Sequence, residues 1–322
     1  MRIFVSEHYA AIFLGVLFLC VVLLICWVFF VSDGGQRGIS FDIDSTGKKI
    51  VFSANGEGGR DLFLLDLITK KVSRVTQTPL YERTPSFSSD GQTILYTGSS
   101  EPLSSAHLYT CTLDGKNRTQ LTFGETTYDE SPRFSPDGKE IVFARSTLRR
   151  EYSMGGWKWS HWDVYKCKAD GSEVARLTTE QSYDLYPPFW TPDGKSVLYN
   201  DDANTYLLSL TTGERRLIPE AKSFPFLSPD GKEVGYVASG KKEFDYEVWL
   251  TTLKGEKHLL ITDTKAYNTY PRFLPDGKSI LFLSDQRREH RYDLWQVNAD
   301  GKNLHRIADS TLFANPLRWK PN

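Results

Sequence analysis

The sequence predicts an all-β fold, a six-bladed β-propeller of four-stranded blades, preceded by one transmembrane helix. Three observations support this prediction. A tight turn between two apolar stretches occurs six times, with its glycine at Gly47, Gly91, Gly138, Gly194, Gly231 and Gly277. Successive copies lie 44, 47, 56, 37 and 46 residues apart, a spacing typical of propeller blades. Residues 10–31, in contrast, form a run of 22 residues without a charged side chain.

The apolar N-terminal run is long enough to cross a bilayer as a helix. We therefore expect an N-terminal tail (1–9), a transmembrane helix (10–31), a linker (32–38) and a propeller (39–322). The alternative is a cleaved secretion signal, but the run is longer than a typical signal core and has no small-residue cleavage site at its end. Arg2 favours the amino terminus on the cytoplasmic side. We expect a single-pass protein of the cytoplasmic (inner) membrane with its propeller on the periplasmic side.

Each repeat unit has the pattern of four strands. The first strand ends at the Asp-Gly type turn, and the second is a continuous apolar run, such as residues 280–282. The third strand alternates, as in residues 293–297, and a second Asp-Gly turn leads into a short, polar fourth strand. Asp-Gly between such runs is the strongest short-range hairpin signal.

The turn motif also resembles a known family. Residues 135–139, 191–195, 228–232 and 274–278 all read x-Pro-Asp-Gly-Lys, whereas residues 45–48 form a degenerate copy. These repeats resemble those of TolB-like propellers, which also occur in prolyl-oligopeptidase-type peptidases. The resemblance covers residues 39 to 322 and implies envelope protein partners. The motif itself is structural, and one fold hosts many functions.

The last residues, 315–322, form another copy of a first strand without a second strand after it. In TolB-like propellers such a tail closes the ring as the inner strand of the first blade. Residues 41–43 compete for the same position. We expect six blades with a C-terminal closing strand; a truncated seventh blade is the alternative.

An aromatic and acidic theme precedes several first strands, where it would ring one mouth of the central channel. The predicted mouth residues are Tyr81, Glu82, Tyr128, Glu130, Tyr183, Tyr186, Tyr267 and Tyr270. One interpretation is a funnel for a ligand or peptide. The other is that these side chains pack neighbouring blades together and cap the ends of strands.

The longest repeat owes its length to residues 145–162, which we expect to form a loop on the face with long, varied connections. Its apolar and basic side chains are of the kinds that dominate interface hot spots. The predicted partner-binding residues are Arg149, Arg150, Tyr152, Trp157, Trp159 and Trp162. The alternative is a loop that folds back over the propeller and covers it with its tryptophans.

Catalytic motifs such as Gly-x-Ser-x-Gly and His-Glu-x-x-His do not occur in the sequence, and we expect no catalytic residue, metal or cofactor. The net charge of −1 gives no attraction for nucleic acid. We predict a non-catalytic, membrane-anchored scaffold or accessory subunit that binds a membrane or envelope protein, with no small-molecule substrate. The alternative is a propeller that binds carbohydrate or another small ligand, or a metal-dependent enzyme similar to oligogalacturonate lyases. Such an enzyme would need His and acidic residues clustered on the inner strands.

Overall fold

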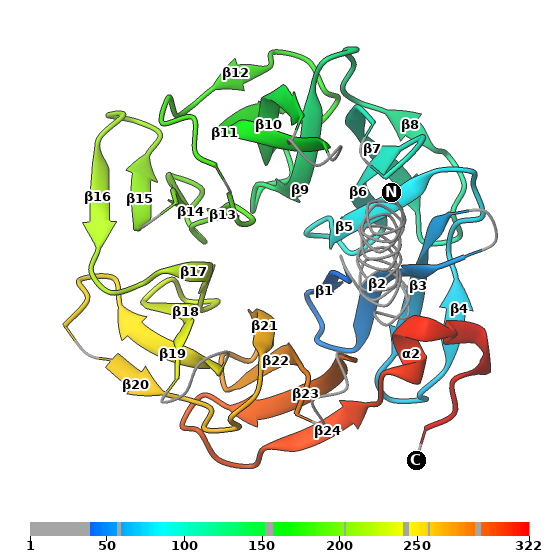
Figure 1. The fold of residues 1–322 in the computed structure, drawn as a ribbon, viewed down its shortest axis with the longest axis vertical. Coiled ribbons are helices and arrows are strands. Elements are labelled where there is room, and N and C mark those ends of the chain that lie inside the picture. Colours follow the sequence, from blue (N-terminus) through cyan, green and yellow to red (C-terminus); the bar gives the residue numbers. More distant parts are fainter. Residues whose placement is uncertain are drawn as a thin grey trace, which may run out of the picture.

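The computed structural model describes residues 39–321, apart from 57–58, 103, 152–156, 184, 203, 241–244, 257 and 287–290. These residues form six four-stranded antiparallel units around a central axis (Figure 1). Within each unit, every strand pairs with the next one along the chain. The predicted transmembrane helix at 10–31 lies outside the described residues. Among the helices that the structure does describe, none has the length and apolar character needed to cross a membrane.

The first three blades run from inner to outer strand in chain order. They are β1 (Phe41–Ile43), β2 (Lys49–Asn55), β3 (Arg60–Asp66), β4 (Val72–Arg74), β5 (Tyr81–Phe87), β6 (Thr93–Ser99), β7 (Ala106–Thr112), β8 (Thr119–Gln120), β9 (Tyr128–Phe134), β10 (Glu140–Glu151), β11 (Trp157–Lys168) and β12 (Ala175–Arg176). Single parallel pairs, Arg60 with Tyr81 and Ala106 with Tyr128, connect these blades to each other.

The other three blades repeat the same order, and two short helices follow them. The elements are β13 (Phe189–Trp190), β14 (Ser196–Asn200), β15 (Thr205–Ser209), β16 (Arg215–Ile218), β17 (Ser223–Leu227), β18 (Glu233–Ser239), β19 (Tyr246–Thr252), β20 (His258–Leu260), β21 (Asn268–Phe273), β22 (Ser279–Ser284), β23 (Asp293–Asn298), β24 (His305–Ala308), the α-helix α2 (Thr311–Ala314) and the 3-10 helix η1 (Pro316–Arg318). The predicted four-stranded repeat is therefore confirmed.

The Asp-Gly turns form because their own side chains satisfy the backbone. In the turn between β9 and β10, the Asp137 carboxylate accepts hydrogen bonds from Ser135 Oγ (2.6 Å) and from the Lys139 N–H (3.1 Å). These bonds, the one from Ser135 first, lower the pKa of Asp137. Gly138 has a φ of 72°, a conformation that side chains disfavour. In the degenerate first copy, Asp44 does the same work by accepting the N–H groups of Lys48 and Lys49 at 2.9 and 2.8 Å.

The core lies between neighbouring blades, where apolar side chains of successive sheets pack against each other. Leu95 and Leu108 of the second blade, for example, share one cluster with Ile141 and Phe143 of the third. The second strand is buried over most of its length in the first, second, fourth, fifth and sixth blades. This explains why its sequence is a continuous apolar run. The predicted core strands are thus found where the pattern placed them.

The prediction of a C-terminal closing strand is wrong. β1 is the inner strand of the first blade, with Phe41 paired to Phe52 of β2. The chain end instead forms α2 and η1, which lie over the outer side of the first blade (Figure 1). Phe313 of α2 packs edge-on against Phe52, with ring centroids 5.5 Å apart. The ring is closed by apolar packing because β1 has already filled the inner position.

Candidate functional site

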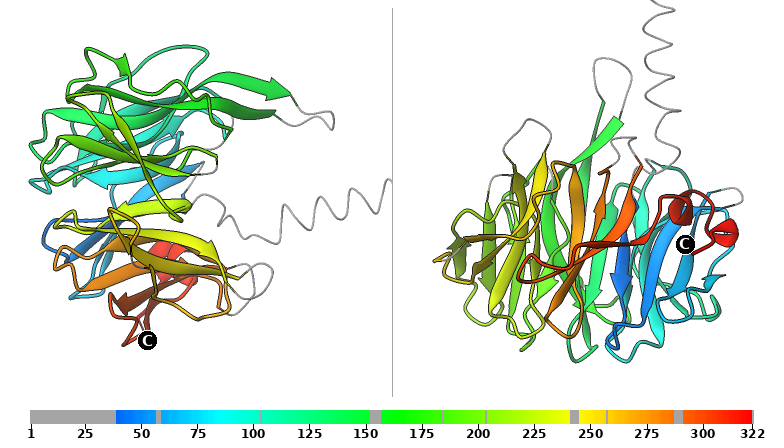
Figure 2. Two further views of the ribbon diagram at one scale, coloured as in Figure 1. Left: turned by 90° about the vertical axis from the view of Figure 1, so that its left-hand side faces the viewer. Right: turned by 90° about the horizontal axis from the view of Figure 1, so that it is seen from below.

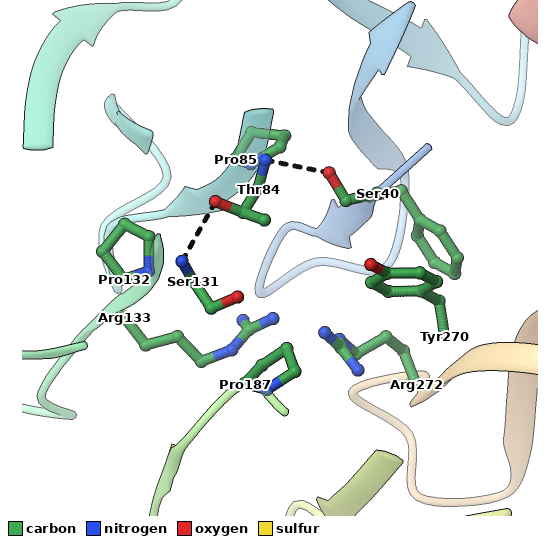
Figure 3. Close-up of a pocket in the computed structure, with 10 residues that line it drawn as sticks. Ser40, Thr84, Pro85, Ser131, Pro132, Arg133, Pro187, Tyr270 and Arg272 are labelled. Carbon is green, nitrogen blue, oxygen red and sulfur yellow. Dashed lines mark hydrogen bonds between the residues drawn. The ribbon is translucent and has the colours of Figure 1, made fainter. Parts of the chain in front are cut away.

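The inner strands carry a repeated backbone irregularity at the channel axis. Thr84, Ser131, Phe224 and Tyr270 have φ values of 47°, 58°, 49° and 49°, and each precedes a proline. Non-glycine residues rarely adopt this left-handed conformation, and such strain is characteristic of functional positions. The turned backbone ties neighbouring blades together (Figure 3). The Thr84 N–H donates to Ser40 Oγ at 2.8 Å, and the Ser131 N–H donates to Thr84 Oγ1 at 3.1 Å.

The structure brings some of the predicted mouth tyrosines together around the axis. Tyr186 and Tyr270 both pack against Phe224, with ring centroids 4.2 and 5.0 Å from it. Burial, with the charge of Glu130 as a smaller cause, raises the pKa of Tyr270 to about 12. These rings come from three different blades and form one aromatic contact, so they match the packing interpretation.

Other predicted mouth residues lie apart from this contact. Tyr267 packs against Tyr246 at 4.9 Å between ring centroids. Tyr128 is buried beneath the β10–β11 hairpin, whereas Tyr183 keeps 46% of its surface exposed. Tyr81 is half-buried and pairs with β3. The predicted ring is therefore not one continuous surface.

Glu82 is not at the mouth surface, since its side chain is completely buried. Its carboxyl group accepts hydrogen bonds from the hydroxyl groups of Thr76 and Thr78, the latter at 2.8 Å. Burial raises the pKa of Glu82 to about 7, and the threonine bonds act against this shift. Glu82 therefore caps the end of the fourth strand of the preceding blade.

The same threonine–carboxylate contact recurs around the ring. Thr122 Oγ1 donates to Asp129 at 2.6 Å, and Thr178 Oγ1 donates to Asp163 at 3.0 Å. Each of these hydroxyl groups also accepts a backbone N–H of the third strand, as Thr122 does from Leu108 at 2.9 Å. Asp129, like Glu82, lies on the first strand of the next blade, whereas Asp163 lies on β11 in the same blade as Thr178; each carboxylate is a structural element between strands.

The predicted partner-binding loop is a β-hairpin, which corrects the expectation for residues 145–162. β10 and β11 pair from Glu140 with Lys168 out to Glu151 with Trp157. The two strands pair through their backbones, although residues 145–151 contain one apolar side chain and show no alternation that would predict a strand. The hairpin projects beyond the neighbouring strands of the propeller (Figure 2).

Trp159 and Trp162 form the base of this hairpin. They are 6% and 8% exposed, and both rings contact Tyr128, at 5.4 and 5.7 Å between centroids. Arg149 is exposed on β10, opposite Trp159. Arg150 and Trp157 lie in the two strands, and Tyr152 lies outside the described residues. Two of the predicted tryptophans thus stabilise the hairpin, and partner binding stays a prediction.

Arginines gather at the axis, although none of them is among the residues predicted from the sequence. Arg133 and Arg272 occupy the same position in two repeats, directly after Ser-Pro and Tyr-Pro pairs. Both guanidinium groups lie over the ring of Phe189, at 4.4 and 4.7 Å from its centroid. The repeated x-Pro-Arg order was the signal that could have revealed them.

The described residues hold no group of three His, Cys, Asp or Glu side chains placed to bind a metal ion. His107, His161 and His305 lie in β7, β11 and β24, away from the inner strands. The two described cysteines, Cys111 and Cys167, are free thiols with 1% of their surface exposed. Burial raises the pKa of each to about 12, so neither is an activated nucleophile.

A family model and a curated relative both connect this chain to TolB. A family model described as the TolB beta propeller domain matches residues 40–161 and 158–321. The Tol-Pal system protein TolB of Francisella tularensis subsp. mediasiatica (strain FSC147) is 24% identical over 230 residues, covering 67% of this chain and 48% of that protein. The chain thus spans about half the length of this curated relative.

Two solved structures show the same fold. TolB from Acinetobacter baumannii has a TM-score of 0.66 at 19% identity, covering 81% of this chain and 63% of that one. An oligogalacturonate lyase in complex with manganese has a TM-score of 0.53 at 15% identity, covering 80% and 88%. At this identity each likeness shows the fold alone. Since the family model spans almost all of the blades described above, the chain belongs to the TolB β-propeller family.

Proposed function

We propose that this protein is a non-catalytic protein-interaction module of the cell envelope. In this proposal residues 10–31 anchor it in the cytoplasmic membrane, and the propeller lies on the periplasmic side. Support comes from the relative named as a Tol-Pal system protein and from the uncharged N-terminal run. With residues 32–38 as the linker, the propeller stays within about 25 Å of the bilayer, so its partner is membrane-bound or close to the membrane.

The β10–β11 hairpin is the observation that carries this proposal. β9 pairs with β10 only as far as Ser146, opposite Tyr128. β12 pairs with β11 at Tyr165 and Lys166. The outer part of the hairpin consists of Leu148–Glu151 of β10 and Trp157–Ser160 of β11. The strand pairing described there joins β10 and β11 to each other. Strand edges of this kind are templates for a further strand from a partner.

The charge of the outer hairpin indicates which partner it suits. Its sequence contains three basic residues and one acidic residue: Arg149, Arg150 and Lys158, and Glu151. An extended segment with net negative charge would therefore associate faster than a neutral one. The buried Trp159 and Trp162 hold the hairpin base to Tyr128, so the edge is presented on a fixed support.

The test is extraction of native membranes in a mild detergent, followed by size analysis and identification of copurifying proteins. The unmodified chain is compared with Arg149→Glu, and with Arg118→Glu as a control on an exposed connection of the second blade. We expect a stoichiometric envelope protein that Arg149→Glu releases and Arg118→Glu retains. Migration of the unmodified chain alone would contradict the interaction function, and equal retention in both variants would contradict the hairpin as its site.

The side of the membrane has a separate test. Protease added to intact cells, to cells with a permeabilised outer layer and to lysed cells should digest the propeller in the second and third cases. Digestion only after lysis would contradict the periplasmic location.

A further inference from the structure

A cleft lies on the face of the propeller that carries the Asp-Gly turns, at the seam between the sixth blade and the first. β10 begins at one of these turns and continues into the projecting hairpin, so the turn face is opposite to the hairpin (Figure 2). This seam cleft has a volume of about 330 Å³ and is lined by the turns β1–β2, β3–β4 and β21–β22 and by β23 and β24. An apolar cavity of about half this volume can hold a benzene ring, so the seam cleft has room for a large side chain.

Leu274, which lines the seam cleft, replaces a polar residue of the other repeats. Two positions before the turn aspartate, the second to fifth repeats have Ser88, Ser135, Thr191 and Ser228. In the fifth blade, Ser228 Oγ donates to Asp230 at 2.7 Å and accepts the Glu233 N–H at 2.9 Å. Leucine can make neither bond. The turn of the sixth blade therefore lacks the hydroxyl group that stabilises the other turns and places an apolar side chain in the seam cleft.

Ile68 is a second apolar replacement at the same seam. It lies in the β3–β4 turn, between the cleft residues Leu67 and Lys70, and is 67% exposed. The other blades have polar residues at this point of the turn: Asp114, Asp170, Thr211, Lys254 and Asp300. The Asp66 carboxylate accepts the N–H groups of Ile68 and Thr69 at 2.9 and 2.7 Å. The turn therefore holds Ile68 at the rim of the seam cleft.

Packing inside the propeller accounts for only one of these two replacements. Leu274 is half-buried and packs against the apolar core of the seam. Ile68 belongs to none of the apolar clusters found in the described part of the chain, so its exposure brings the folded chain no burial of apolar surface. Apolar side chains from distant parts of the sequence that gather at one exposed cleft are typical of a binding surface.

The charges around the seam cleft are mostly positive. Its three turns contain five lysines and three aspartates: Lys48, Lys49, Lys70, Lys71 and Lys278, and Asp44, Asp66 and Asp276. In other turns the lysine pairs with the aspartate of its own turn, as Lys232 and Lys302 do at 3.2 and 3.5 Å. Within the described residues, the five seam lysines form no such ion pair. The excess of positive charge favours an acidic partner.

We propose that the seam cleft binds a protein segment that carries one large apolar side chain flanked by aspartate or glutamate. The apolar side chain contacts Leu274 and Ile68, and the flanking carboxylates meet Lys70 and its neighbours. Because this surface is opposite to the β10–β11 hairpin, the propeller can hold two partners at once. Either proposal can therefore fail without the other.

The test uses the full chain in detergent and a library of short random peptides displayed on phage. Peptides that bind the unmodified chain are counter-selected against Ile68→Thr, and the remaining ones are synthesised and titrated by fluorescence anisotropy at low and high salt. We expect these peptides to share an apolar residue with acidic neighbours, to bind one per chain and to bind more weakly at high salt. Selection of basic peptides, or of none, would overturn the proposal.

Variants that take no part in the selection provide an independent test. Leu274→Ser restores the residue type of the other repeats, so its turn is kept, and it should weaken peptide binding about 10- to 100-fold. Lys70→Glu should weaken binding and remove much of its salt dependence. Leu217→Thr is the control, because it removes a leucine that is 47% exposed on β16, in the fourth blade, and it should bind like the unmodified chain.

Two other outcomes would also overturn the proposal. Equal weakening by Leu274→Ser and Leu217→Thr would show general adhesion to apolar surface. Self-association of the unmodified chain that Ile68→Thr abolishes, measured by analytical ultracentrifugation, would show that a second copy of this chain occupies the seam cleft in place of an acidic segment.

Discussion

The threonine–carboxylate contact between blades makes a strong prediction for the Thr122→Val variant. Thr122 is 2% exposed, and its hydroxyl group donates to Asp129 at 2.6 Å while it accepts the Leu108 N–H at 2.9 Å. Valine has nearly the same shape, so the substitution removes both hydrogen bonds without leaving a cavity. Asp129 keeps the Arg145 guanidinium, bound at 2.8 Å through Nη2, and so is not left as an unpaired charge.

The expected loss of stability follows from the hydrogen bonds that the Leu108 N–H and the Asp129 carboxylate lose. A buried N–H without an acceptor costs about 1–3 kcal/mol, and a hydrogen bond to a charged group contributes about 1.5–3 kcal/mol. Because Arg145 retains part of the compensation, we expect a loss of about 2–4 kcal/mol in the free energy of unfolding. In a domain of this length, each kcal/mol of lost stability lowers Tm by about 2 °C, so we expect Tm to fall by about 4–8 °C. Differential scanning calorimetry and urea unfolding measure both quantities.

The matched control is Thr119→Val on β8, where the threonine is exposed and its hydroxyl group makes only a 3.5 Å contact with the Asn117 carbonyl. That change should stay within about 0.5 kcal/mol of the unmodified chain. If Thr122→Val and Thr119→Val destabilise the protein equally, the contact between blades does not stabilise the ring and the reasoning is refuted.

Three further predictions concern burial, turn geometry and the hairpin. Burial raises the pKa of Glu82 from the ordinary glutamate value of 4.5 to about 7 in the folded protein, so Glu82 makes stability fall as the pH rises from about 4.5 to about 7 and has no further effect above that window. Glu82→Gln should therefore gain Tm relative to the unmodified chain at pH 8 but not at pH 4; an unchanged pH profile of Tm in the variant would contradict the buried assignment. Gly91→Ala should cost only the strain of φ 68°, about 1–2 kcal/mol, because nothing lies within 4 Å of the added carbon. Gly115→Ala, at φ 75°, should cost several times more by urea unfolding, because its Cβ would lie 1.9 Å from a backbone carbonyl oxygen of the preceding blade; equal losses would argue against this close contact between blades. Trp159→Ala should destabilise the protein by about 3–5 kcal/mol and speed amide hydrogen exchange in β10 and β11, since it removes the ring packed on Tyr128; exchange that stays slow there would show that this ring does not hold the hairpin.

Much of the fold follows from short-range chemistry. The Asp-Gly turns were predictable because Ser135, Asp137 and Gly138 satisfy each other within a few residues. The buried second strands were predictable because both of their faces meet other sheets, which requires continuous apolar sequence. The hairpin at residues 145–162 could not be predicted in this way, because residues 145–151 are polar except for Leu148 and carry no strand pattern; its strands form as an extension of the β10–β11 ladder that begins at Glu140 and Lys168.

The tertiary structure decided how the ring closes. The C-terminal tail carries the pattern of an inner strand, yet β1 holds that position. β1 and β2 are joined by a short turn, so their pairing loses far less chain entropy than pairing across the entire ring. Local pattern shows that a segment can form an inner strand. Competition for a single position is settled only when both candidates are placed in the fold.

The candidate site shows the same division. From the sequence came the aromatic and acidic theme and the basic, tryptophan-rich segment, because these are clusters along the chain. Only the structure showed that Glu82 is buried, that Trp159 and Trp162 support the hairpin, and that Arg133 and Arg272 lie over the same Phe189 ring. The arginines belong to blades that are far apart in the chain, so they meet only when the ring brings those blades around one axis.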